Sequence, residues 1–479
     1  MPDRSYRPAA PWCSHRRPPS ASRAGAGRSP YPGAGTVRAS PPPKPGLPLR
    51  RWSALAAGLA LSSAAPAGAA EPARVVHLDE AVTQALQQQP LLVAAQANVG
   101  AAQGVAEQSR SVLLPQLSAS ALGQRFYGAT GSRTGAATGT AGRTAANNFT
   151  FNLSGTQLIW DFQSVDRFGS SNATVASLQA TEQATLLQVI LNVRRSFFQA
   201  QAYSALVRVQ EETLENQIKH QTQTEGFVKA GTQPEISLAQ ARTNVANARV
   251  SLIQAENNYR IAKAQLNQSM GVVQGTDYEV ANEELPPVEG ENRPVDQLMA
   301  VALHERPEVA ALTKNREAQE LSLRAAKGGY APAISVFGSV AEAGSSLDGL
   351  GPAWNFGLQV TWNFFDGLKT PGNVRQAEGN VSGASAQLTA EELQVRFDVE
   401  QADATLEGNK TALTAAEDAL VNAKEQLRLA EARYQTGVGS IIELSDAQVA
   451  ATNAGAQLVQ ARYNLATARA QLLAALGRR

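Results

Sequence analysis

The sequence predicts a mainly α-helical fold with membrane β-strands, built as an internally duplicated coiled coil with four strands per chain. Three observations lead to this fold class. Long segments without proline repeat apolar residues every three and four positions, as helices in a coiled coil do. Four shorter segments alternate apolar and polar residues, which is the period of a β-strand. The order of these segments occurs twice along the 479 residues.

The first 70 residues differ in composition from the rest of the chain. They hold ten Lys and Arg residues and one acid, so the remainder carries a net charge of about −8 although the whole chain has +1. Arg50 and Arg51 precede the apolar run WSALAAGLALSSAA, and small residues follow up to Ala70. This order is typical of a secretory signal peptide, so residues 1–70 are predicted to be an N-terminal extension and signal, with cleavage near Ala70.

Residues 1–45 are rich in Pro, Arg, Ser and Gly and extend beyond what a signal peptide needs. A start codon assigned too far upstream explains them, and whether they are translated stays open. Cys13, the single cysteine, lies in this segment, so we expect an exported part without disulfides, without a thiol nucleophile and without a lipid-anchored cysteine. The acidic body lacks the clustered positive charge that nucleic acid binding requires, and we expect no such partner.

Two copies of one unit follow, predicted at residues 71–282 and 295–479, with a Pro- and Glu-rich linker at 283–294. LDEAVTQALQQQPLLVAAQ in the first copy resembles VDQLMAVALHERPEVAALT in the second, and the proline falls at the same place in both. Each copy is interpreted as a helix, two strands, a long helix, a tip turn and a further helix.

Helical spacing is clearest towards the end of each copy. Apolar residues follow steps of three and four over 413–434 and 444–472, and the first copy repeats this register over 238–266. The Gly-containing turns KAGTQPEISL and QTGVGSIIEL would join antiparallel helices into hairpins. The helix before the second turn, from about 375 to 434, would be a rod of roughly 90 Å. Such a rod belongs in a bundle, a tunnel or a stalk.

The four predicted strands are residues 116–127, 148–160, 333–342 and 354–365. A Gly/Thr/Ala loop at 128–148 separates the first pair and a shorter loop separates the second, so each pair is predicted to be a hairpin. In the last strand, WNFGLQVTWNFF, six apolar side chains are predicted to share a lipid-facing side: Trp354, Phe356, Leu358, Val360, Trp362 and Phe364.

Alternating strands of about ten residues in an exported chain are typical of an outer-membrane β-barrel. Taken alone, one such strand is more often half-buried in a soluble sheet, but the duplication, the signal peptide and the rod-length helices favour the barrel. Lipid leaves no place for an open sheet edge. Two chains would make a plugged eight-stranded barrel, whereas three make twelve strands with an open lumen. We therefore predict a homotrimeric channel whose helices continue the barrel.

The sequence also resembles a known family, the TolC-like outer-membrane efflux proteins, which serve as outer membrane factors of type I secretion and multidrug efflux. The resemblance covers residues 75–477. It is carried by LDEAVTQALQQQPLLVAAQ, LLPQLSAS, the strand ends IWDF and FFDG, and the turns FVKAGTQPEISLAQAR and RYQTGVGSIIELSDAQ. It implies a homotrimer with a twelve-stranded barrel and a twelve-helix periplasmic tunnel. It also implies two partners, a periplasmic adaptor protein and an inner-membrane transporter of ABC or RND type.

The resemblance assigns roles to the hairpin turns, which in the family form a gated periplasmic mouth. Tyr434 corresponds to a tyrosine of the closing network. Glu443 and Asp446 correspond to an entrance ring, which in a trimer would hold six carboxylates and favour cations. Acids are also favoured at any helix N-terminus, so a purely structural role stays open.

Other tip residues depart from the family pattern. Gly439 stands where the family prototype has an arginine, and Ser237 stands where an acid is expected, with Glu235 nearby. A leakier resting gate than the prototype's follows as a hypothesis. The residues implied to contact the adaptor are Gly231, Thr232, Gly437 and Val438.

No catalytic constellation is visible, and we expect no enzyme, no cofactor and no metal site. The histidines His15, His77, His220 and His304 share no metal-ligand spacing, and the Gly-rich loop lacks the Lys-Ser/Thr of a phosphate loop. The rival hypothesis is a non-conducting trimeric coiled-coil structural protein or adhesin in the outer membrane. An adaptor is a closer rival, but adaptors lack paired strands. The cargo, the pump and the resting gate state stay open, although the missing lipid cysteine leans towards secretion.

Overall fold

The computed structural model describes residues 74–129, 143–273 and 275–479. All of them lie in one compact unit, Ala69–Arg479. The predicted signal peptide and its cleavage near Ala70 lie outside the described residues, as does the centre of the loop predicted at 128–148.

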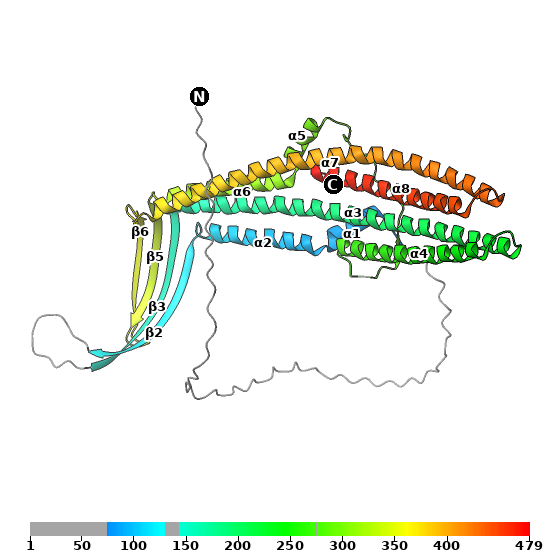
Figure 1. The fold of residues 1–479 in the computed structure, drawn as a ribbon. Helices are drawn as coiled ribbons and strands as arrows, with labels where there is room; N and C mark the ends of the chain where they lie inside the picture. Colours follow the sequence, from blue (N-terminus) through cyan, green and yellow to red (C-terminus); the bar gives the residue numbers. More distant parts are fainter. Residues whose placement is uncertain (1–73, 130–142, 274) are drawn as a thin grey trace, which may run out of the picture. The chain divides into compact units, whose positions relative to one another are not determined.

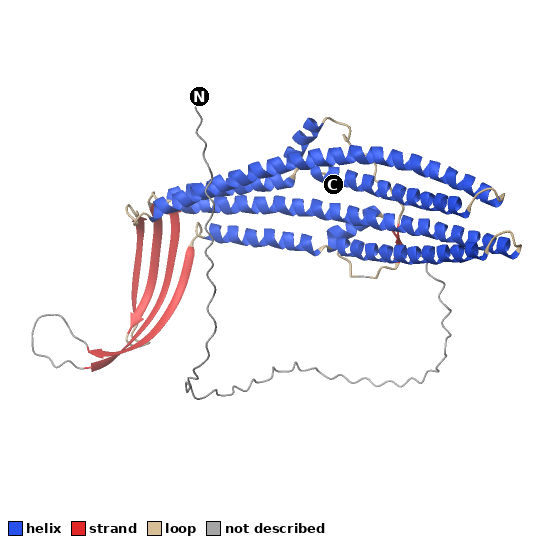
Figure 2. Cartoon of the chain, viewed as in Figure 1, coloured by secondary structure: helices blue, strands red, loops and turns tan. Residues whose placement is uncertain are grey.

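The same order of elements occurs in both halves of the described chain (Figures 1 and 2). The first half contains β1 (Arg74–Val76), α1 (Leu78–Gln88), α2 (Pro90–Ser111), β2 (Gln116–Ala129), β3 (Arg143–Trp160), α3 (Phe162–Lys229) and α4 (Glu235–Met270). The second half contains β4 (Tyr278–Val280), α5 (Val295–Glu305), α6 (Pro307–Gly328), β5 (Ala333–Gly344), β6 (Gly351–Thr361), α7 (Lys369–Gln435) and α8 (Ile441–Ala475). Since nothing further delimits the copies, the boundaries at 71–282, 283–294 and 295–479 stay predictions.

Four strands form one antiparallel sheet in the order β2-β3-β5-β6, so that the two hairpins meet at β3 and β5. β2 and β6 are the sheet edges, and neither has a second neighbour within the described chain. A separate parallel pair joins β1 to β4, with Arg74 opposite Tyr278.

The first hairpin is longer than the sequence predicts. Residues 128–148 are predicted to be a loop, but the ladder between β2 and β3 continues to the pairs Gly128–Thr144 and Ala129–Arg143. β5 also runs two residues beyond its predicted end, to Gly344. Small Gly, Ala and Thr residues weaken the alternation of apolar and polar side chains, so periodicity alone does not reveal these strand ends.

The prediction for the last strand is wrong at both ends. β6 spans Gly351–Thr361 rather than 354–365, and therefore Trp362 and Phe364 lie beyond it. Thr361 pairs with Ala333, the first residue of β5, so residues after Thr361 have no neighbouring strand to pair with. The chain instead turns at Leu368, whose φ of 71° places it in the left-handed region.

An aspartate accepts first-turn amides in each long helix. Asp161 is the N-cap of α3, which starts directly after β3, whereas Asp366 precedes α7 in the connection that follows β6. The Asp161 carboxylate accepts hydrogen bonds from the amides of Gln163 and Ser164, both at 3.1 Å. Asp366 accepts the amide of Thr370 at 2.8 Å. Side-chain acceptors at these positions satisfy amides that lack a partner in the first turn. IWDF therefore spans the junction of β3 and α3, whereas FFDG lies in the connection between β6 and α7.

The two long helices, α3 and α7, contain 68 and 67 residues, which corresponds to roughly 100 Å each. α7 begins at Lys369, earlier than the predicted 375, because Pro371 lies in its first turn, where a missing N–H costs nothing. Each long helix forms an antiparallel hairpin with the helix that follows it. Within the described residues, no helix combines the length and the apolar composition needed to cross a membrane.

Two apolar clusters hold the helices together near the middle of α3 and α7. The first surrounds the fully buried Phe197 and Leu266, and brings α3 and α4 against α1, β1 and β4. The second surrounds Leu406 and Leu472, and brings α7 and α8 against α5. The segment between β4 and α5 contributes Leu285 to the first cluster and Val288 to the second.

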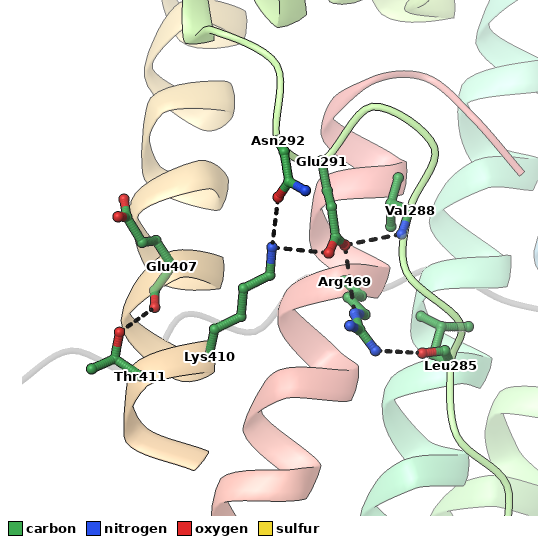
Figure 3. A network of polar contacts seen from close by, with 8 residues as sticks. All are labelled: Leu285, Val288, Glu291, Asn292, Glu407, Lys410, Thr411 and Arg469. Carbon is green, nitrogen blue, oxygen red and sulfur yellow. Dashed lines mark hydrogen bonds and ion pairs between the residues drawn. The ribbon is translucent and has the colours of Figure 1, made fainter. Parts of the chain in front are cut away.

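Polar contacts fasten the same segment to α7 and α8 (Figure 3). Glu291, 8% exposed at its side chain, lies 2.9 Å from Lys410 Nζ and 3.6 Å from Arg469 Nε. It also accepts the Val288 amide at 2.9 Å, and Arg469 donates to the Leu285 carbonyl at 2.7 Å. Burial alone would raise the pKa of Glu291, but these hydrogen bonds and cations together lower it below the ordinary value of 4.5.

Candidate functional site at the hairpin tips

The two tip turns are built in the same way. Gly231 and Gly437 have φ values of 70° and 76°, in the left-handed region that glycine adopts without strain. Thr232 N–H donates to the Phe227 carbonyl and Val438 N–H donates to the Arg433 carbonyl, both at 3.0 Å. These bonds close the helix ends, so Gly231, Thr232, Gly437 and Val438 form the chain reversals of the tips.

Tyr434 lies between the two hairpins and is only 2% exposed. Its hydroxyl lies 3.2 Å from Thr224 Oγ1 of α3 and donates to Gln233 Oε1 of the first tip at 3.3 Å. Its ring packs edge-on against Phe227, with centroids 6.0 Å apart. One side chain of α7 thus contacts α3 and the first turn at the same time.

The turn after α7 leaves no room for a side chain at Gly439. A Cβ there would lie 2.9 Å from the Tyr434 nitrogen and 3.0 Å from the Arg433 carbonyl carbon. The arginine expected at Gly439 is therefore excluded by this turn. The same turn holds another arginine in an ion pair, with Arg433 Nε 3.2 Å from Glu443 Oε1.

The sequence analysis assigns no role to Arg433. The one feature that could have identified it is its position directly before Tyr434. The ion pair joins α7 to α8 within one hairpin, and both side chains are about half exposed. Ser440 caps α8 by accepting the Glu443 amide at 3.1 Å. Glu443 is thereby held at the turn by its backbone and by its carboxylate.

Ser237 and Asp446 line a groove of about 280 Å³ between the first turns of α4 and α8, and Glu443 is not among its lining residues. The groove is lined by Ile236, Ser237, Gln240, Ile441, Ile442, Ser445 and Asp446. Glu235 is exposed in the first turn of α4. The tip groove therefore has apolar walls with a carboxylate and hydroxyls at its edge.

Three further polar contacts between α3 and the second hairpin were missed by the sequence reasoning. Thr213 and Thr452 hydroxyls lie 3.1 Å apart. Gln217 donates to Gln448 Oε1 at 2.8 Å. His220 Nε2 of α3 lies 3.5 Å from Glu431 Oε1 of α7, and the His220 side chain is 13% exposed. An analysis of apolar periodicity does not register polar residues on the same helix face.

The apolar face of the sheet is exposed in the single chain. The exposed fractions are 81%, 76%, 65% and 59% for Trp354, Phe356, Leu358 and Val360. Directly paired residues share a face, so Val336 and Val340 of β5 lie on the same face. Trp362, beyond the strand, donates its indole N–H to the Tyr330 carbonyl at 3.1 Å.

The opposite face of the sheet carries most of its polar side chains, together with Leu122, Phe126 and Phe337. Ser118, Ser154, Ser339 and Asn355 lie in one row across the four strands. Ser118 and Ser154 hydroxyls are 2.8 Å apart, and Ser339 donates to Asn355 at 2.9 Å. In the described part of the chain, no three His, Cys, Asp or Glu side chains are grouped closely enough to hold a metal ion.

Comparison with known sequences gives one family. The family model described as "Outer membrane efflux protein" matches residues 81–272 and 298–478. The chain is 28% identical over 338 residues to "Solvent efflux pump outer membrane protein SrpC" of Pseudomonas putida, covering 65% of this chain and 68% of that protein. It is 27% identical over 445 residues to "Outer membrane protein TolC" of Escherichia coli, covering 88% and 85%.

Solved structures share the fold. The CmeC outer membrane channel of Campylobacter jejuni has a TM-score of 0.75 at 19% identity, over 84% of this chain and 85% of that one. VceC of Vibrio cholerae has a TM-score of 0.73 at 20% identity, over 84% and 96%. At these identities the likeness concerns the fold alone.

Proposed function

Since the chain belongs to the outer membrane efflux protein family and is located in the outer membrane, we propose that it is the exit duct of an export system and works as a homotrimeric channel. The observation that carries this proposal is the four-stranded sheet with two open edges, β2 and β6, and one exposed apolar face. In lipid those edges must be paired. Three copies, joined β6 to β2, would close twelve strands around a lumen lined by the polar face.

On this proposal the apolar face contacts lipid. Leu358 lies on that face and Gln359 on the other. Leu358→Arg should destabilise the assembled barrel by about 2–4 kcal/mol near the membrane midplane, whereas Gln359→Arg should leave assembly intact. Native mass spectrometry of detergent-extracted protein distinguishes trimers from monomers. Normal trimers from Leu358→Arg would contradict the lipid-facing assignment.

The hairpin tips are proposed to be the periplasmic gate. Tyr434 supports this role because it joins both hairpins, so its contacts must break when the hairpins separate. Glu443 and Asp446 of three chains would place six carboxylates around the entrance and favour cations. Planar-bilayer recordings test both points, since a passive channel conducts and Glu443→Gln with Asp446→Asn should lower its cation preference. An absence of conductance would instead favour the non-conducting stalk or adhesin.

The tips are also proposed to dock a periplasmic adaptor that connects the duct to an inner-membrane transporter of ABC or RND type. The apolar groove beside Ser237 and Asp446 supports this, because Ile236 and Ile442 are 75% and 69% exposed there. The names of the relatives, a solvent efflux pump component in one case, favour small-molecule efflux over the secretion branch. Cross-linking at Gly231, Thr232, Gly437 or Val438 in cells would capture the adaptor.

A further inference from the structure

A cavity of about 270 Å³ lies between the middle of α3 and the second helical hairpin. Phe198, Ala202 and Ala205 of α3 form one wall, and Leu465 lies on the wall formed by α8. The segment between β4 and α5, here called the connecting segment, lines the cavity with residues 282–285. We call this space the connector cavity. Its lining residues are all different from those of the tip groove.

The walls of the connector cavity favour an aromatic ligand. Phe198 and Tyr463 contribute rings to the lining, and Leu413 and Leu465 contribute aliphatic side chains. Aromatic rings bury a large apolar area and pack well edge-on or offset against other rings. A dry cavity of about 150 Å³ in another protein holds benzene. The connector cavity therefore has room for a single ring with a short substituent.

Two buried polar atoms of the lining side chains have no hydrogen-bond partner among the described residues. One is Gln201 Oε1, an acceptor, and the other is Arg469 Nε, a donor. The other ends of both side chains are engaged. Gln201 Nε2 donates to Asn282 Oδ1 at 2.7 Å, and Arg469 Nη1 donates to the Leu285 carbonyl at 2.7 Å (Figure 3). At 3.6 Å, the carboxylate of Glu291 is too far from Arg469 Nε for a hydrogen bond.

This pair of atoms selects the chemistry of the ligand. A polar atom that is buried without a partner is costly, and the cost is recovered when a ligand supplies the partner. A hydroxyl group donates one hydrogen bond and also accepts, so a single hydroxyl can serve both Gln201 Oε1 and Arg469 Nε. A hydrocarbon ring without this group leaves both atoms unpaired.

The charged side chains of the connector cavity favour an uncharged ligand. Three acids and two arginines line it, namely Glu283, Glu284, Glu417, Arg462 and Arg469. Glu283 lies 2.6 Å from His77 Nδ1 and accepts the Leu78 amide at 3.2 Å. Glu417 lies 3.9 Å from Arg462, and Arg469 faces Glu291. The remaining acid, Glu284, is exposed. The charges therefore neutralise one another and leave little to attract an ion into the cavity.

We propose that the connector cavity binds a small uncharged aromatic alcohol or phenol, with its ring beside Phe198 and Tyr463 and its hydroxyl between Gln201 and Arg469. The inference goes beyond the proposed exit duct, which requires neither the cavity nor an occupant. A ligand in this place contacts α3, α8 and the connecting segment at the same time. It should therefore stabilise the packing of these three elements.

Equilibrium dialysis of radiolabelled benzyl alcohol against the assembled protein in lipid nanodiscs tests the proposal. Toluene lacks only the hydroxyl, and benzylamine carries an ammonium group in its place. We expect benzyl alcohol to bind about tenfold more tightly than toluene, because toluene leaves the two buried atoms unpaired. Equal binding of these two compounds, tighter binding of benzylamine, or no saturable binding of benzyl alcohol would each overturn the inference.

Cavity-filling variants locate the binding site. Ala205→Phe should abolish saturable binding because its ring occupies the cavity, and uptake by lipid remains as the background. Ala466→Phe fills the same cavity from α8 and takes its place if Ala205→Phe does not assemble. Ala184→Phe is the matched control, since Ala184 is half-buried on α3 and does not line the cavity. Binding that survives in the cavity-filling variants, or that is lost in Ala184→Phe as well, contradicts the assignment.

Discussion

The middle of the long helices and the hairpin tips are stabilised differently. In the middle, fully buried side chains such as Phe197 and Leu472 belong to two large apolar clusters, and Glu291 fastens the connecting segment to α7 and α8. Towards the tips the apolar cluster around Tyr434 is smaller, and hydroxyls, amides and one imidazole face one another between α3 and the second hairpin. An apolar seam is costly to open at any place, whereas a polar one exchanges protein partners for water. The difference teaches that one coiled coil can combine a firmly packed middle with a more weakly packed tip, the part that the proposed gate would move.

The largest expected effect is a loss of stability in the firmly packed middle of the helices. Phe197→Ala removes a ring from a fully buried position and should cost about 3–5 kcal/mol of stability. Thermal denaturation of the purified protein measures it. Phe397→Ala, at a half-exposed position of α7, should shift stability by less than about 0.5 kcal/mol. Similar losses from both variants would show that the apolar cluster around Phe197 is not the main source of stability.

A second prediction removes the fastening of the connecting segment. Glu291→Gln weakens charge-assisted hydrogen bonds to Lys410 and the Val288 amide and should cost about 1.5–3 kcal/mol. Glu289→Gln, an exposed neighbour, is the control. Hydrogen exchange should increase in the connecting segment and not at the tips. Exchange confined to the tips would contradict the assignment.

The same carboxylate predicts a pH dependence. Since its folded-state pKa is lowered below 4.5, its contribution is present above pH 4.5 and is lost as the pH falls through the lower, folded-state pKa. The melting temperature should therefore drop in this acidic range. In Glu291→Gln the drop should be smaller, and equal drops would remove Glu291 from the explanation.

A smaller effect on stability is expected at the hairpin tips. Tyr434→Phe keeps the ring contact with Phe227 but removes the hydroxyl that meets Thr224 and Gln233. The loss is about 1 kcal/mol, roughly a fivefold shift towards the open tip, with little change in melting temperature. Open probability in bilayers measures it. Tyr330→Phe, at a half-exposed position, should behave like the wild type.

The smallest effect concerns the ion pair at the second turn. Arg433→Ala should cost less than about 1 kcal/mol because both Arg433 and Glu443 are about half exposed. It should raise cation preference, since the Glu443 carboxylate loses its neutralising partner. Arg428→Ala, an exposed arginine further along α7, is the matched control, and reversal potentials in a salt gradient provide the readout.

The sequence predicts the strands, the long helices and their turns because each has a strong local signal. The alternation of apolar and polar residues around Leu358 identifies β6. It cannot show that Thr361 is the last residue with a partner strand, so the sequence wrongly predicts Trp362 and Phe364 to lie in the strand. Tyr434 was found through the family resemblance. Gln217 and His220 were not, since their significance depends on which α8 and α7 residues lie opposite, and single-chain periodicity carries no such information.

The pairing of β1 with β4 also has a consequence for folding. It joins Arg74 to Tyr278 across about two hundred residues, whereas each helical hairpin joins sequence neighbours. Distant contacts carry a larger chain-closure entropy and form late. The hairpins should therefore form first and the strand at the start of the described chain should dock last. If the signal peptide predicted within residues 1–70 is still attached, we expect this final step to be delayed.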